Sequence, residues 1–157
     1  MGGAMARRLL SIGFALTVYD PLEGRLAACV AAGAKAAASA SEVVQREEYV
    51  LTSLRSSAVF VEVAERDLLP HARSGQVFLD LGTTEAAETR RLAAAFAGRG
   101  ATLLDTPVSG GPVGSETGSL HIFVGGAEEA VQRCRPILEA LGAPGKVVHC
   151  GPSGAGQ

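Results

Sequence analysis

A chain of 157 residues forms one domain as a rule and is long enough to bury a sizeable core. Its residues are 47% hydrophobic but only 4% aromatic, which predicts an interior of Ala, Val and Leu side chains. The net charge of −2 provides no basic field for nucleic acid, and no apolar run approaches the ~18 residues of a membrane-spanning helix.

Short apolar runs alternate along the chain with helical patterns of about 10–15 residues. The predicted strands are 15–19, 49–54, 77–81, 102–105, 121–124 and 146–150. The predicted helices are 1–10, one opened by Pro21, one capped by Ser39 or Ser41, 57–67, 85–99 and 128–141. This alternation predicts an α/β fold, a doubly wound and mostly parallel sheet with helices on both faces.

The first residues carry part of a nucleotide-binding pattern. Such a sheet binds nucleotides at the carboxyl ends of its strands, where a Gly-x-Gly-x-x-Gly loop usually precedes the first helix. The chain begins at Met1-Gly2, which fits only the tail of that loop. Asp20 follows Gly2 by 18 residues, close to the ~20 at which an acid meets the adenosine ribose. An acid there favours NAD, with NADP left open, and Asp20 can also cap the helix after Pro21.

Two further predicted strands end in polar loops. Leu54 ends the run 49–54 and is followed by Arg55, and Gly82-Thr83-Thr84 follows the run 77–81. Taken singly, such loops are ordinary helix starts with Ser or Thr caps. Their regular placement after successive strands also fits contacts with a cofactor.

The most informative stretch runs from Asp105 through Ser109-Gly110-Gly111 to Gly126. An apolar run predicts a buried strand ending at Asp105, and Pro107 then fixes one φ. The two glycines remove side chains, so backbone N–H groups can face a small anion with the Ser109 hydroxyl as a further donor. The alternative is a plain tight turn at the end of a strand.

The last seven residues read Gly-x-x-Gly-x-Gly-Gln, from Gly151 to Gln157. The glycine spacing is similar to that of a phosphate-binding loop. Gln157 stands where that loop needs its lysine, however, so a P-loop kinase fragment is the weaker interpretation.

Cysteines and histidines give no sign of a metal or disulfide site. The three cysteines are scattered, without a Cys-x-x-Cys pair, which predicts reduced thiols and a cytoplasmic or organellar-matrix protein. Arg7-Arg8 before an apolar run imitates a signal peptide, but no cleavage pattern of small residues follows. The three histidines lack metal-ligand spacing, and we expect His121 to be packed or at a strand edge, without a catalytic role.

Read as a whole, 105–126 resembles the substrate-binding signature of the β-hydroxyacid dehydrogenases. That group includes 3-hydroxyisobutyrate dehydrogenase and tartronate semialdehyde reductase, in the 6-phosphogluconate dehydrogenase superfamily. Met1-Gly2 with Met5-Ala6, and the last seven residues, match the family as well. The resemblance implies a Rossmann-like dinucleotide-binding domain over 1–150 that lacks its first strand. It implies that 151–157 begin an interdomain helix and that the C-terminal helical domain is absent.

The resemblance also implies roles for individual residues. Ser109, Gly110 and Gly111 would hold the carboxylate of a short β-hydroxy acid. The cofactor contacts would be Met1, Gly2, Asp20, Leu54, Arg55 and Thr83. The family's catalytic lysine follows about one turn past Gln157, so we expect no catalytic residue in this chain and little or no dehydrogenase activity from it alone. The parent protein would be a homo-oligomer.

Two positions depart from the family pattern. Arg55 stands where a Pro or small residue is usual, and Gly82 replaces a Ser. These departures keep a second function open, that of a non-catalytic dinucleotide-binding or assembly module. A lysine one turn past Gln157 in the parent protein would favour the enzyme, and a non-basic residue there the module.

Overall fold

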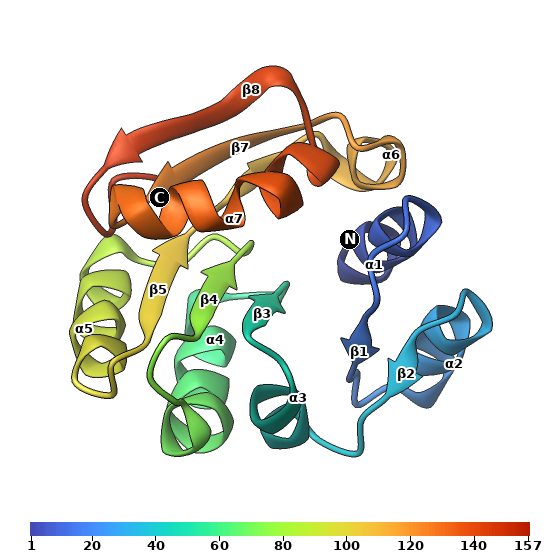
Figure 1. Ribbon diagram of the computed structural model, residues 1–157, viewed down its shortest axis with the longest axis horizontal. Coiled ribbons are helices and arrows are strands. Elements are labelled where there is room, and N and C mark those ends of the chain that lie inside the picture. The colour runs from blue at the N-terminus through green and yellow to red at the C-terminus, as the bar shows by residue number, and fades with distance from the viewer.

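The computed structural model describes all 157 residues and has seven α-helices and eight strands (Figure 1). The helices are α1 (Gly2–Ser11), α2 (Glu23–Ala31), α3 (Ala40–Arg46), α4 (Ser57–Val63), α5 (Ala86–Ala97), α6 (Gly111–Thr117) and α7 (Glu128–Leu141). The strands are β1 (Thr17–Val18), β2 (Lys35–Ala36), β3 (Tyr49–Thr52), β4 (Val77–Asp80), β5 (Thr102–Asp105), β6 (Val108–Ser109), β7 (Leu120–Gly125) and β8 (Gly142–Gly151). None of the helices is long and apolar enough to cross a bilayer.

The main sheet has six strands in the order β3-β4-β5-β7-β6, with β8 paired to β7. Strands β3, β4 and β5 are parallel and in register, so that Thr52, Asp80 and Asp105 lie side by side at their carboxyl ends. Strand β7 runs antiparallel to β5 and β6 and parallel to β8. The mostly parallel, Rossmann-like α/β fold expected from the alternation of elements is thereby confirmed.

Alternating side chains of the central strands build a core on each face of this sheet. Val77 and Leu79 of β4 face a cluster that includes Met5 of α1 and Leu138 of α7. Phe78, between them, faces the other cluster, which α3, α4 and α5 cover. There the Phe78 and Phe96 rings pack with centroids 4.4 Å apart.

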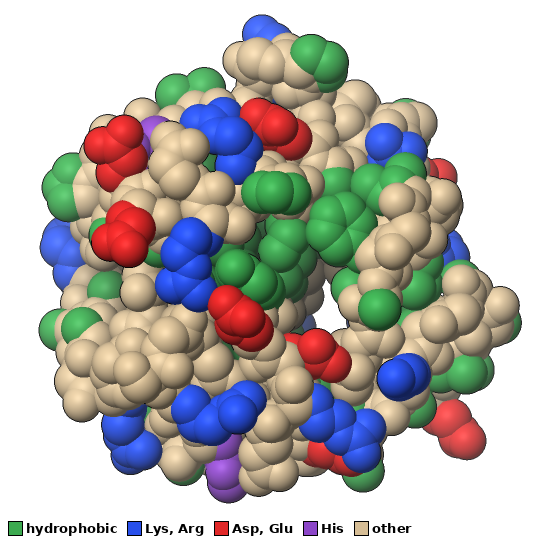
Figure 2. Space-filling model, viewed as in Figure 1, with side chains coloured by type: hydrophobic (Ala, Val, Ile, Leu, Met, Phe, Trp, Pro, Cys, Tyr) green, Lys and Arg blue, Asp and Glu red, His purple; other side chains and the backbone are tan.

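The strands β1 and β2 form a small parallel sheet of their own. They do not pair with β3, which has β4 as its only neighbour. Phe14 and Leu16, which precede β1, and Tyr49 and Leu51 of β3 are only partly buried against the main core. Figure 2 shows the molecule hollowed between this unit and the main body.

Several boundaries differ from those that the sequence predicts. The helix expected to open at Pro21 begins at Glu23, because Leu22 is extended and its N–H binds the Asp20 carboxylate at 2.9 Å. The helix expected over 57–67 is α-helical only to Val63 and continues as a π-helix, Ala64–Leu68, and a 3-10 turn, Leu69–His71. Of the two candidate caps of α3, Ser39 is the one that caps the helix, because its hydroxyl oxygen accepts from the Glu42 N–H.

Three elements have no counterpart among the predicted ones, namely β2, β6 and α6. Helix α6 contains two glycines and a proline, residues with poor helix propensity. Packing supports it, since a Cβ at Gly114 would lie 3.0 Å from the side chain of Leu120. Tertiary contact therefore overrides local preference in this segment.

Candidate functional site

Two buried carboxylates define the carboxyl end of the central sheet. Asp80 ends β4, Asp105 ends β5, and the two are partners in register. The two residues are 1% and 0% exposed. Neither forms an ion pair, so both charges depend on hydrogen bonds from the loops that follow the strands.

Asp80 organises the loop after its own strand. Its Oδ1 accepts from the Gly82 N–H at 3.1 Å and from the Thr52 hydroxyl at 3.2 Å. Its Oδ2 accepts from the Thr84 hydroxyl at 2.6 Å. Burial raises the pKa of Asp80, these hydrogen bonds oppose the rise, and the neighbouring Asp105 adds to it.

Asp105 holds a loop from the far end of the chain. Its two oxygens accept from the N–H groups of Gly154 and Gly156 at 2.8 and 2.9 Å. Gln157 then reaches the first loop, because its Oε1 accepts from the Thr84 N–H at 2.8 Å. Its Nε2 is buried without a partner. The loops 81–85 and 151–157 are thus tied into one unit at the ends of β4 and β5.

The Ser109-Gly110-Gly111 turn lies open to solvent. Ser109 ends β6 as an exposed residue, and its hydroxyl has no hydrogen-bond partner in the protein. Gly110 and Gly111 have φ of 135° and 61°, where a side chain would be strained. Helix α6 starts at Gly111 and packs against α1, with an Arg7–Glu116 contact at 3.6 Å (Figure 1).

Three of the six predicted cofactor residues, Met1, Gly2 and Leu54, come together around the start of α1. Met1 is the N-cap of α1, and a Cβ at Gly2 would lie 3.2 Å from the Cβ of Ser53. Leu54 follows Ser53, and its carbonyl lies 3.3 Å from the position of a Cβ on Gly82. The first turn of α1 and the two strand-end loops are therefore neighbours.

The other three predicted cofactor residues are Arg55, Thr83 and Asp20. Thr83 and Arg55 are exposed, and neither side chain has a partner in the protein. Asp20 is half-exposed in the β1–β2 unit, where it caps the start of α2 through Leu22. It makes no hydrogen bond to the other predicted cofactor residues.

Sequence reasoning missed the roles of Asp80, Asp105 and Gln157. The available signal is that each aspartate ends a buried strand at an equivalent position. The contacts themselves join residues 49 and 73 positions apart. Local sequence patterns cannot predict contacts between residues that lie so far apart in the chain.

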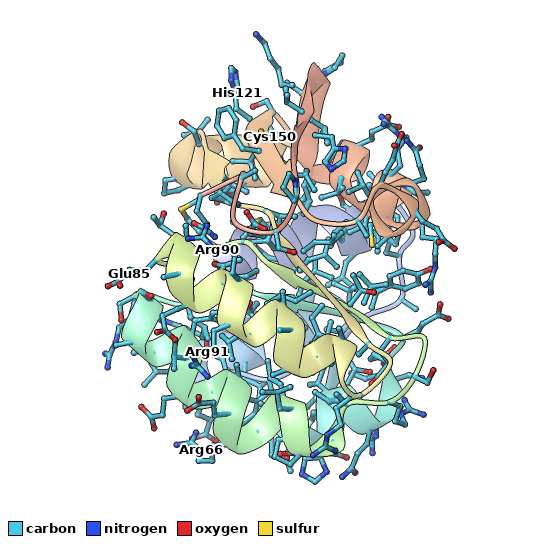
Figure 3. All side chains as sticks on the ribbon, turned by 90° about the vertical axis from the view of Figure 1, so that its left-hand side faces the viewer. Arg66, Glu85, Arg90, Arg91, His121 and Cys150 are labelled. Atoms are coloured by element: carbon cyan, nitrogen blue, oxygen red, sulfur yellow. The ribbon has the colours of Figure 1, made fainter.

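Several other chemistry-bearing side chains lie outside this site. The open groove between α4 and α5, about 580 Å³ in volume, is lined by acids that Arg91 bridges, with Glu65 at 2.8 Å and Glu88 at 2.7 Å (Figure 3). Burial raises the pKa of the Cys134 thiol to about 11, which makes it a poor nucleophile. No group of His, Cys, Asp and Glu side chains converges as a metal site.

Comparison with known proteins gives one family and several longer relatives. The family described as the NAD binding domain of 6-phosphogluconate dehydrogenase matches residues 1–151. An NAD-dependent L-serine dehydrogenase of Pseudomonas aeruginosa is 41% identical over all of this chain and 53% of its own length. A probable 3-hydroxyisobutyrate dehydrogenase of Mycobacterium tuberculosis is 35% identical over all of this chain and 52% of its own length. The chain spans about half the length of the curated relatives it matches.

Solved structures agree in fold. The 3-hydroxyisobutyrate dehydrogenase of Mycobacterium tuberculosis, determined with L-serine, has a TM-score of 0.92 at 35% identity, over 99% of this chain and 53% of that one. Psf3 in complex with NADP+ and 2-OPP has a TM-score of 0.94 at 29% identity, over 100% of this chain and 56% of that one.

Proposed function

Since the chain belongs to the family of the NAD-binding domain of 6-phosphogluconate dehydrogenase, we propose that it is the cofactor-binding half of a β-hydroxyacid dehydrogenase. The observation that carries the proposal is the exposed Ser109-Gly110-Gly111 turn beside α1. Its two positive-φ glycines and its unpartnered hydroxyl are at the surface, available to a ligand. The substrate class is that of short β-hydroxy acids, as in 3-hydroxyisobutyrate dehydrogenases.

The turn offers donors for a carboxylate. The Ser109 hydroxyl and the N–H groups of Gly110 and Gly111 would each bind a carboxylate oxygen. Fixing the acid group orients the carbon that bears the alcohol. A bound nicotinamide supplies the acceptor or donor of the hydride.

The residues around α1 fit a dinucleotide. A Cβ at Gly2 would lie only 3.2 Å from that of Ser53, and with Gly3 next to it the start of α1 offers backbone N–H groups that can meet a pyrophosphate. Leu54, Arg55 and Thr83 would border the same cofactor. Asp20 would bind the adenosine ribose and repel the 2′-phosphate of NADP, which makes NAD the preferred cofactor.

The rest of the protein completes the enzyme in this proposal. The catalytic lysine follows Gln157, on a helix that leads into a second, helical domain. One further strand lies between β1 and β3 and joins the two sheets, whose facing edges are unpaired. The whole protein acts as a homo-oligomer in the cytoplasm or an organellar matrix.

The alternative is a non-catalytic dinucleotide-binding or assembly module, which the sequence keeps open through its departures from the family pattern at Arg55 and Gly82. The structure gives Gly82 a packing reason, because a Cβ there would lie 3.2 Å from Asp80 Oδ1 and 3.3 Å from the Leu54 carbonyl. The glycine at position 82 is therefore not evidence that the chain has lost a catalytic function. Arg55 is then the only departure that favours the module.

Calorimetric titration of the chain with NAD and with NADP tests the cofactor assignment. Asp20→Asn should raise the ratio of NADP to NAD affinity about tenfold, since it relieves roughly 1.4 kcal/mol of charge repulsion. Glu23→Gln, which removes a nearby carboxylate in the first turn of α2, is the matched control and should leave the ratio unchanged. Equal ratios for Asp20→Asn and the unmodified chain would contradict the assignment.

An assay of turnover by the chain alone tests whether the proton-transfer group lies outside it. With NAD and 3-hydroxyisobutyrate, we expect no sustained rise in nicotinamide absorbance, because the proton-transfer lysine is assigned to the region past Gln157. Sustained turnover would show that this chain already contains the proton-transfer group.

A further inference from the structure

We propose that His121 is a second ligand of the substrate carboxylate, placed beside Ser109 on the neighbouring strand. The inference rests on the proposed function, because it takes the Ser109 turn as the site of the acid. It adds a side chain whose role neither the family nor the relatives' names indicate.

Strand pairing places the two side chains together. Ser109 of β6 and His121 of β7 are direct partners in an antiparallel pair. Partners of this kind share one face of the sheet, with Cβ atoms about 4.5–5.5 Å apart. Leu120 and Ile122, on either side of His121, are fully buried on the opposite face. His121 therefore lies on the same open face as the Ser109 hydroxyl.

His121 is also the histidine without a partner. The His149 Nε2 lies 2.9 and 3.1 Å from the carbonyls of Gly126 and Gly151, and the His71 Nδ1 lies 3.3 Å from the amide of Gln45. His121 makes no hydrogen bond and no ion pair, and it projects from the outer surface of the sheet (Figure 3). Its ring N–H is free for a ligand.

A carboxylate has two oxygens and accepts several hydrogen bonds. The Ser109 hydroxyl and the glycine N–H groups approach it from the end of β6. The imidazole N–H approaches from β7, so that the second oxygen gains a donor. A charged acceptor makes this bond stronger than one between neutral groups.

The test is a titration of the 15N-labelled chain, saturated with NAD, with 3-hydroxyisobutyrate. The amide shifts of Ser109, Gly110 and Gly111 report binding. His121→Leu should lower the affinity for 3-hydroxyisobutyrate about tenfold or more, the loss expected for a hydrogen bond to a charged group. His121→Gln keeps an N–H donor and should restore most of the affinity. His71→Leu, the same change at a distant histidine, should have no effect.

A neutral analogue separates a role in binding from a structural one. The amide of 3-hydroxyisobutyrate lacks the carboxylate, so His121→Leu should alter its binding much less than that of the acid. The affinity for NAD should be the same in all variants. If the acid binds the Ser109 turn and His121→Leu leaves its affinity unchanged, the inference about His121 is overturned and the proposed function stands. If the unmodified chain binds no acid at this turn, both are overturned.

Discussion

Asp80 and Asp105 are neighbouring carboxylates whose partners come from different parts of the chain. Asp80 binds groups close to it in sequence or on the adjacent strand, and Asp105 binds the N–H groups of Gly154 and Gly156. Neither has a cation to offset burial. Each is therefore stabilised by the loop that it orders, and disordering the loop would leave a buried charge unsatisfied.

The raised pKa of Asp80 predicts a pH dependence of stability. A carboxyl whose pKa is higher in the folded than in the unfolded state adds stability below its unfolded value, near 3.8, and this contribution is lost as the pH rises through the folded pKa. Asp80→Asn removes the titrating carboxyl group, so the variant does not lose this stability as the pH rises. The free energy of unfolding of the variant should therefore rise relative to the unmodified protein as the pH increases above 3.8.

Urea denaturation of both proteins over a series of pH values measures this difference. Asn keeps an oxygen for the Gly82 N–H, so the variant should still fold. A difference that is constant with pH, or that falls as the pH rises, would contradict the assignment.

At the scale of elements, the loop 151–157 is docked by close backbone contact. A Cβ at Gly156 would lie 2.5 Å from the Phe123 carbonyl and 2.9 Å from the Gly125 N–H nitrogen. The loop can lie this close to β7 only because residue 156 has no side chain. Its position in turn sets where the chain proceeds past Gln157.

Gly156→Ala should therefore destabilise the protein by about 1–3 kcal/mol, the usual range for overpacking. The matched control is Gly24→Ala in α2, where a Cβ meets nothing within 4 Å. Alanine there should stabilise the protein by about 0.5–1 kcal/mol. Thermal unfolding of the two variants gives the comparison, and a neutral Gly156→Ala would show that the loop is not held against β7.

The alternation of elements could be read from the sequence because each central strand is a short apolar run. Gln76 and Asp80 bound the apolar residues 77–79, and Thr102 and Asp105 bound Leu103 and Leu104. The β6–α6 segment could not, since its glycines and proline indicate a turn, and 111–117 is helical where it packs against α1, α7 and β7. Likewise, the link from Thr84 to Gln157 requires the whole sheet to be formed first.

At the scale of the whole molecule, the protein has one well-packed body and one loosely attached unit. The β1–α2–β2 unit contributes a single buried helix residue, Cys29, and its strands do not join the main sheet. Leu22 and Val30 of this unit are 53% and 42% exposed, although the helical pattern places them on an apolar face. The unit should open more easily than the main sheet.

Native-state hydrogen exchange measures this opening directly. The N–H groups of Lys35 and Ala37, bonded to the carbonyls of Leu16 and Val18, should exchange at least about tenfold faster than those of Thr102 and Thr106, bonded to the carbonyls of Gln76 and Asp80. Saturating NAD should slow exchange at Lys35 and Ala37, because Asp20 lies in the same unit. Equal protection at all four amides would contradict this account.

The most direct test of the central claim is a map of the two ligands on the 15N-labelled chain. NAD should shift the amides of Gly2, Asp20, Leu54, Arg55 and Thr83, and 3-hydroxyisobutyrate, added next, should shift those of Ser109, Gly110 and Gly111. That result would place a carboxylate on the glycine turn beside a bound dinucleotide. Shifts confined to other surfaces, such as the groove between α4 and α5, or no saturable shift at 109–111, would contradict it.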